Sequence, residues 1–184
     1  SLPPFNYIII NFLTFSFFFI FLIKKSNQKK NTKLFFIYGW LFGFGYFVTN
    51  LYWISISLTF DQNFKFLIPL TIILIPAFLA IFYGLISYLF FILKPKKTIN
   101  LLLIFSLLFG VLEFIRGSIL TGFPWNLIAF SFSNQLELLS ITSILGTYGF
   151  NLICITLFSS PALLILKDKK KNIGVIIFFI ICMI

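Results

Sequence analysis

The sequence lacks histidine altogether, and it contains only two cysteines and four acidic residues in 184 positions. Without imidazole side chains, neither a histidine-ligated metal site nor a histidine-based catalytic triad can form. Cys154 and Cys182 both lie inside apolar runs and neither has a C-x-x-C partner, so we expect inert buried thiols. No glycine-rich nucleotide-binding motif is present either. The sequence therefore predicts no metal ion and no other cofactor.

Charged residues are also scarce, at 10% of the chain against about 25% in a soluble domain, whereas hydrophobic residues make up 60%. The hydrophobic residues are gathered into apolar runs, most of which approach or exceed the roughly 20 residues that cross a bilayer as a helix. These runs are Phe5 to Ile23, Leu34 to Leu58, Leu67 to Leu93, Ile99 to Leu112, Leu138 to Leu166 and Ile173 to Ile184. We therefore expect residues 1–184 to form one all-α, polytopic transmembrane helix bundle, with about five complete spans and a truncated sixth.

The net charge is +10, and the lysines that produce it lie between the apolar runs. The loops 24–33, 94–98 and 167–172 carry five, three and four lysines, whereas the loops after the second and fourth runs carry one base each, Lys65 and Arg116. The positive-inside rule places the lysine-rich loops in the cytoplasm and the other ends of the helices outside it. Because no basic face occurs on a soluble element, we expect no nucleic-acid partner.

The second apolar run carries three closely spaced glycines, Gly39, Gly43 and Gly45. Glycines at this density allow neighbouring membrane helices to approach closely, so we interpret them as helix-packing residues together with Trp53. Trp53 lies near the far end of the run, where amphipathic rings prefer the membrane interface. Pro76 is interior to the third run and should bend that helix.

Later in the chain, breaks in the helical pattern are expected at two places. Gly117, Gly122 and Pro124 should end or sharply bend the helix that begins at residue 99. The G-T-Y-G sequence at Gly146 to Gly149 should interrupt the fifth run, which membrane helices tolerate only where protein or water satisfies the freed backbone groups. The polar stretch Ser131 to Glu137 is expected at the membrane surface.

One short stretch combines charge with these breaks. It reads E-F-I-R-G-S-I-L-T-G-F-P-W from Glu113 to Trp125. Glu113 is the acid expected at membrane depth, and on a helix it shares a face with Arg116, so the two can form an ion pair. An ionisable pair in hydrocarbon is a functional-site hypothesis, because burying charge there is costly. The alternative is a purely structural pair that holds two helix ends together.

The same stretch resembles the bacterial apolipoprotein N-acyltransferases. The resemblance rests on T-G-F-P-W-N at Thr121 to Asn126, preceded by E-F-I-R-G at Glu113 to Gly117. The glycine-rich helix from Gly39 to Leu58, the sequence L-G-T-Y-G-F-N at Leu145 to Asn151 and the opening L-P-P-F are similar to that family in order and spacing. The resemblance covers essentially the whole chain.

The resemblance implies an acyltransferase of the bacterial cytoplasmic (inner) membrane. This family transfers an acyl chain from a membrane phospholipid to the amino-terminal cysteine of a diacylated lipoprotein. Its fold is a bundle of eight membrane helices that carries an extracytoplasmic nitrilase-like domain with a Glu–Lys–Cys triad. By the resemblance, this chain begins after the first helix and ends within the seventh. We therefore expect a fragment without catalytic residues, inactive alone, that supplies lipid access and scaffold.

Within this fragment, the turn from Gly117 to Asn126 is predicted to line the lateral opening for lipid substrates. Phe123 and Trp125 would contact acyl chains or support the missing domain. Arg116 would either fix the turn with Glu113 or attract a phospholipid phosphate, for which a guanidinium group is well shaped. The alternative is that the motif only packs the bundle. The complete set of predicted lipid-access residues is Glu113, Arg116, Gly117, Thr121, Gly122, Phe123, Pro124 and Trp125.

Two other functions remain open at this point. A small membrane transporter or channel would need polar residues from several helices to meet at mid-membrane. The candidates for such a path are sparse, namely Asn6, Asn11, Asn50, Asn151 and Glu113. A structural membrane subunit would need no catalytic groups at all.

Overall fold

The computed structural model describes residues 7–28, 31–95, 97–119, 122 and 126–166, and within these residues it contains helices and no strand. Among these residues, five helical segments are long and apolar enough to cross a membrane. They are α1 (Ile8–Asn27), α2 (Thr32–Leu51), the segment Lys65–Leu93 with α4 (Ile68–Leu93), α5 (Thr98–Ser118), and the segment Thr142–Leu164 with α7 (Thr142–Ser159). The predicted all-α bundle with five complete spans is confirmed, while the expected sixth run and loop 167–172 lie outside the described residues.

Short helical turns connect these spans. They are α3 (Ile54–Ser57), η1 (Gln62–Leu67), η2 (Ile128–Phe132), α6 (Leu136–Leu139) and η3 (Ser160–Leu164). The apolar run predicted to end at Leu58 is therefore divided, because α2 ends at Leu51 and α3 follows as a separate turn. In contrast, α5 continues through Gly117 to Ser118, so Glu113 and Arg116 both lie on regular helix.

The closest helix pair is α2 with α4, and two of the three predicted packing glycines lie between them. A Cβ atom added to Gly39 would lie 2.2 Å from the Tyr83 carbonyl oxygen, and one added to Gly43 would lie 2.7 Å from the Tyr83 Cβ atom. Gly45 differs, because it is exposed and an added Cβ would meet open space. Gly39 and Gly43 therefore permit the close approach of the two helices, and Gly45 lies on another side of α2.

Aromatic rings fill the centre of the bundle. Phe19 of α1 lies with its centroid 5.0 Å from that of Phe105 on α5, and Phe105 lies 4.9 Å from Phe109. Phe109 in turn meets Tyr83 of α4 edge-to-face at 5.1 Å. These four side chains are fully buried, so α1, α4 and α5 share one aromatic core.

Helix α7 contains the break that its glycines predict. Gly146 adopts φ 71° and ψ 163°, which is not helical and which only glycine adopts readily. Helix α4, by contrast, continues through Pro76. The indole Nε1 of Trp40 donates a hydrogen bond to the carbonyl oxygen of Ala77, the residue after Pro76, at 2.9 Å. This bond joins α2 to the proline-containing turn of α4.

The 3₁₀ turn η2 is buried inside the bundle, so protein covers the first two residues of the polar stretch 131–137. Ser131 is 2% exposed and accepts a hydrogen bond from Asn11 Nδ2 of α1 at 2.6 Å. The backbone N–H of Ala129 donates to Asn151 Oδ1 of α7 at 3.0 Å. Two asparagines thus satisfy irregular backbone and side chains inside the bundle, and exposure begins only at Asn134.

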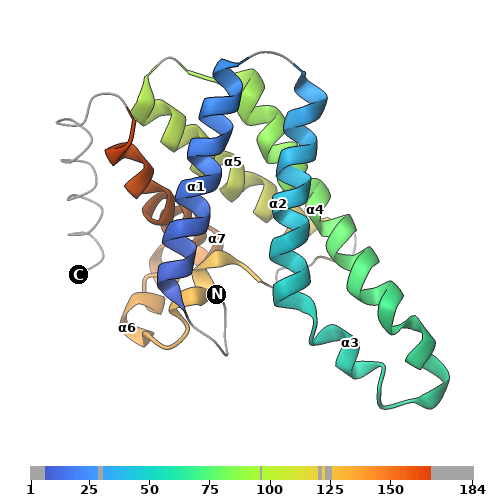
Figure 1. The fold of residues 1–184 in the computed structure, drawn as a ribbon. Coiled ribbons are helices and arrows are strands. Elements are labelled where there is room, and N and C mark those ends of the chain that lie inside the picture. Colours follow the sequence, from blue (N-terminus) through green and yellow to red (C-terminus); the bar gives the residue numbers. More distant parts are fainter. Residues whose placement is uncertain (1–6, 29–30, 96, 120–121, 123–125, 167–184) are drawn as a thin grey trace.

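The two described lysine-rich loops lie at one end of the bundle (Figure 1). The Nζ atom of Lys94, after α4, donates a hydrogen bond to Asn27 Oδ1 at the end of α1, at 2.6 Å. Leu166 is the last described residue and follows η3. It lines the same hollow as Lys24 and Lys94. The short helices α3 and α6 lie at the opposite end of the bundle (Figure 1). In the part of the chain that the structure describes, the basic loops therefore lie at one end of the bundle.

Candidate functional site

A buried polar cluster lies where α4 and α5 face each other. Arg116 donates from Nη2 to Oε2 of Glu113, one turn earlier on α5. Tyr83 of α4 donates its hydroxyl to the other carboxylate oxygen, Oε1, at 2.9 Å. All three residues are at most 2% exposed. The carboxylate therefore receives a donor on each oxygen, one from its own helix and one from its neighbour.

Helix α2 completes this cluster with two aromatic rings. The Arg116 guanidinium carbon lies 5.1 Å from the centroid of the Phe47 ring, a cation–π distance. The Tyr46 ring stacks on Tyr83 with centroids 5.8 Å apart. Side chains from α2, α4 and α5 thus surround one ion pair and shield it from solvent.

The chain after α5 is joined to the same cluster through Tyr46. Its hydroxyl donates to the carbonyl oxygen of Asn126 at 2.9 Å, and Asn126 Nδ2 donates to the carbonyl oxygen of Asn50 at 3.1 Å. Asn126 has φ 58°, in the left-handed region that asparagine tolerates better than most residues. Asn126 is thus fixed against α2 by two hydrogen bonds.

Two glycines make the exit from α5 possible. A Cβ atom added to Gly117 would lie 1.8 Å from the Tyr148 hydroxyl of α7. Gly122 has φ 72°, and its N–H donates to the carbonyl oxygen of Ile119 at 2.9 Å. A side chain at Gly122 would also collide with the Gly117 carbonyl oxygen, at 2.6 Å. The chain therefore turns back on the end of α5 at a place where larger residues do not fit.

The predicted lipid-access residues divide into two groups. The structure brings Glu113 and Arg116 together in an ion pair, and it places Gly117 and Gly122 in the tight exit from α5. Thr121, Phe123, Pro124 and Trp125 lie outside the described residues. Trp53, predicted as a packing residue, lies between α2 and α3 with its side chain 42% exposed.

Sequence reasoning did not identify Tyr83 and Tyr46 as members of this cluster, and it named Asn126 only as the end of the predicted turn. Tyr83 stands 30 positions before its carboxylate partner, and no local spacing connects the two residues. A phenol inside an otherwise apolar run is nevertheless a usable signal, because a buried Tyr hydroxyl usually finds a hydrogen-bond partner.

The described residues around this cluster include few other groups capable of acid–base, nucleophilic or metal chemistry. Among the described residues, no group of three His, Cys, Asp or Glu side chains could hold a metal ion. Cys154 is fully buried on α7 among apolar residues. Since both carboxylate oxygens of Glu113 already accept hydrogen bonds, the geometry favours an anchor between helices over a proton acceptor for substrate.

Comparison with known proteins gives a consistent result. A family model described as the apolipoprotein N-acyltransferase N-terminal domain matches residues 1–159. The apolipoprotein N-acyltransferase of Rhizobium leguminosarum bv. trifolii is 34% identical over 94% of this chain and 33% of its own length. That of Rickettsia prowazekii is 38% identical over 80% of this chain and 29% of its own. That of Rhodopseudomonas palustris is 34% identical over 90% and 31%. The chain thus spans about a third of the length of these curated relatives.

Proposed function

Because this chain belongs to the apolipoprotein N-acyltransferase family, we propose that it forms the membrane domain of an enzyme that N-acylates lipoproteins. The acyl donor is a membrane phospholipid and the acceptor is the amino-terminal cysteine of a diacylated lipoprotein. The Glu–Lys–Cys chemistry of the family belongs to a nitrilase-like domain outside the region matched here. The observation that carries this proposal is the family match over residues 1–159.

The role proposed for residues 117–126 is to border the opening through which lipid reaches the active site. Two hydrogen bonds support this role: that of Tyr83 to Glu113 fixes the end of α5 against α4, and that of Tyr46 to Asn126 fixes the other end of this stretch against α2. Of the two roles considered for Arg116, fixing the turn is better supported than binding phosphate. Its guanidinium group is 2% exposed and already contacts a carboxylate.

We propose that the protein resides in the bacterial cytoplasmic membrane, with its lysine-rich loops in the cytoplasm and residues 117–126 on the other side. The support is the segregation of loops 24–33 and 94–98 to one end of the bundle, combined with the positive-inside rule (Figure 1).

The transporter alternative has less support. It requires polar side chains that face a common path, but Asn11 and Asn151 both turn toward η2, where they bind Ser131 and the Ala129 N–H. Asn50 also donates to the carbonyl oxygen of Tyr46, within its own helix. Each of these three asparagines thus has a local partner that accounts for its position, whereas Asn6 lies outside the described residues.

The test is to express the complete gene that contains this chain in bacteria depleted of their own N-acyltransferase. Mass spectrometry of a reporter lipoprotein would then measure conversion from the diacylated to the triacylated form. We expect conversion, and we expect Arg116→Ala to reduce it about tenfold or more per molecule of inserted protein, with Arg116→Lys closer to wild type. Lys65→Gln, an exposed change in η1, serves as the control. Absence of conversion by correctly inserted wild-type protein would refute the proposed activity.

A further inference from the structure

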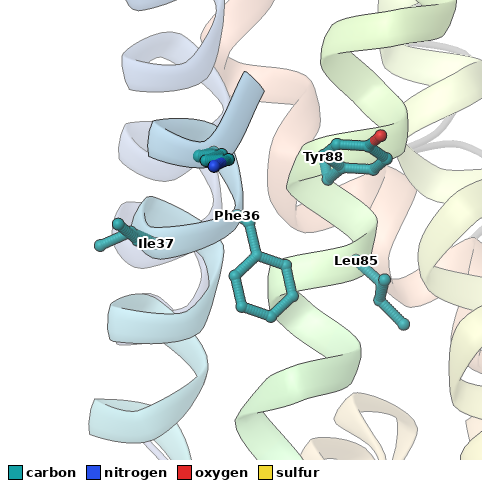
Figure 2. Close-up of a pocket in the computed structure, with 5 residues that line it drawn as sticks. Phe36, Ile37, Leu85 and Tyr88 are labelled. Carbon is teal, nitrogen blue, oxygen red and sulfur yellow. The ribbon is translucent and has the colours of Figure 1, made fainter. Parts of the chain in front are cut away.

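A second lipid-facing feature lies at the lysine-rich end of the bundle, between the outer surfaces of α2 and α4. It is an open groove of about 480 Å³ lined by Lys33, Phe36, Ile37, Leu85 and Tyr88. Figure 2 shows Phe36 and Ile37 on one helix opposite Leu85 and Tyr88 on the other. Apart from Lys33 and the Tyr88 hydroxyl, the side chains that form this groove are apolar.

The groove exists because of a glycine on α4. Gly84 has no side chain, so the Phe36 ring lies directly on it, and an added Cβ would be 2.8 Å from Phe36 Cε2. Ile37 and Leu85 then form the two edges, and they remain 45% and 36% exposed. Both helices are membrane spans, so these apolar side chains face lipid tails rather than water.

Positive charge lies at one end of this apolar groove only. Lys33 belongs to the first turn of α2, where no acidic residue offsets it and where the helix dipole adds further positive potential. The second lining residue with a polar tip is Tyr88, whose ring and hydroxyl suit the boundary between headgroups and tails. The groove thus matches a molecule with a long apolar chain and an anionic head.

We propose that this groove binds one acyl chain of an anionic phospholipid from the leaflet at the lysine-rich end. The chain lies against Phe36, Ile37 and Leu85, and the phosphate lies next to the Lys33 ammonium group. The site is distinct from the proposed substrate opening, because residues 117–126 follow the opposite end of α5. Its occupant stabilises the α2–α4 pair and is not acylated or cleaved.

The test uses the complete protein, purified in neutral detergent and titrated with phosphatidylglycerol or phosphatidylcholine, with retained lipids counted by native mass spectrometry. We expect one phosphatidylglycerol to be retained more tightly than phosphatidylcholine. Lys33→Gln should weaken that retention about fivefold, the effect of one lysine near a membrane surface. The matched control is Lys97→Gln, which removes an exposed lysine at the same end of the bundle but outside the groove.

A second variant tests the apolar part of the site. Leu85→Trp should fill the groove and abolish the tight lipid, and Ile37→Trp does the same from the other edge if the first variant inserts poorly. Equal retention in all variants would overturn the proposal, as would an equal loss in Lys97→Gln, which would indicate only general attraction. If the purified protein were a dimer that retained phosphatidylglycerol only after it had dissociated, the groove would be assigned to a second copy of the chain instead. Acyl transfer does not enter these measurements, so this proposal can fail while the proposed activity stands.

Discussion

At the scale of single residues, the dominant feature is an ion pair held away from water. Glu113 receives donors from Arg116 and Tyr83, while the Arg116 guanidinium group also lies over Phe47. Buried charges are costly to desolvate, and they are tolerated when each is paired and hydrogen-bonded. Removal of one partner therefore does more harm than removal of both, because it leaves the other charge alone in a low-dielectric interior.

This asymmetry gives a direct prediction. Glu113→Gln and Arg116→Met should each destabilise the complete protein by about 3–5 kcal/mol, whereas the double variant should be clearly less destabilised than the sum of the two. The measurement is reversible unfolding in mixed micelles of increasing denaturing detergent. If the two single effects simply add, the residues do not act as a pair.

How much of this cluster the sequence predicts depends on the distance between partners along the chain. Glu113 and Arg116 are one helical turn apart, so their pairing follows from helix geometry. Tyr83 and Tyr46 come from other helices, and only the three-dimensional packing of α2, α4 and α5 brings Tyr83 to the carboxylate and Tyr46 onto Tyr83. Local spacing therefore predicts the pair but not the residues that enclose it.

At the scale of helices, α2 and α4 form the tightest contact through Gly39 and Gly43. The Tyr83 backbone and Cβ atom occupy the space that side chains at these positions would need. Because the same Tyr83 also binds Glu113, close packing of α2 on α4 determines where its hydroxyl lies. Helix packing and the polar cluster are thus coupled through one residue.

Alanine substitutions on α2 test this coupling. Gly39→Ala should cost about 1–3 kcal/mol or more, because overpacking forces the backbones of α2 and α4 apart. Gly45→Ala is the matched control on the same helix and should be neutral or stabilising, since the added methyl group meets open space. Thermal denaturation of the complete protein in detergent would compare the two, and an equal loss in both would contradict the packing assigned to Gly39.

The glycines of α2 and the turn η2 show why the sequence predicts membrane spans better than the contacts between them. The spacing of three glycines predicts close packing of the helix, but only tertiary structure separates Gly39 and Gly43 from Gly45. Hydrophobicity likewise places 131–137 at the membrane surface, but it does not predict that protein covers Ser131 there or that Asn11 is its partner. A polar residue can lie inside a membrane bundle once a partner from another helix satisfies it, and no local pattern reports that partner.

At the scale of the whole molecule, the lysines are distributed unevenly between the two ends of the bundle. Lys24, Lys33, Lys94 and Lys97 lie in or next to the terminal turns of helices at one end of the bundle, whereas η1 and α6 lie at the other end. Such an asymmetry of lysine orients a multi-pass protein in its membrane. Orientation is a property of the complete set of loops, so it could be inferred from the sequence before any contact between helices was known.

The proposed orientation predicts the outcome of thiol labelling in intact cells. In a background from which Cys154, Cys182 and every other cysteine of the complete protein have been removed, Asn63→Cys in η1 should react with a membrane-impermeant maleimide added outside the cytoplasmic membrane. Lys97→Cys should react only after that membrane is permeabilised. Both positions are exposed, so accessibility on the protein surface does not limit either reaction. Reversed labelling would place the lysine-rich loops outside the cytoplasm.

The two asparagines around η2 have a consequence for how the protein is made. Asn11 enters the membrane with the first described span and Asn151 with the last, while Ala129 and Ser131 emerge from the ribosome between them. Until α7 has been synthesised, the Ala129 N–H has no Asn151 amide to accept its hydrogen bond. The hydrogen bond between η2 and α7 can therefore form only after the four described spans that precede α7 have been synthesised.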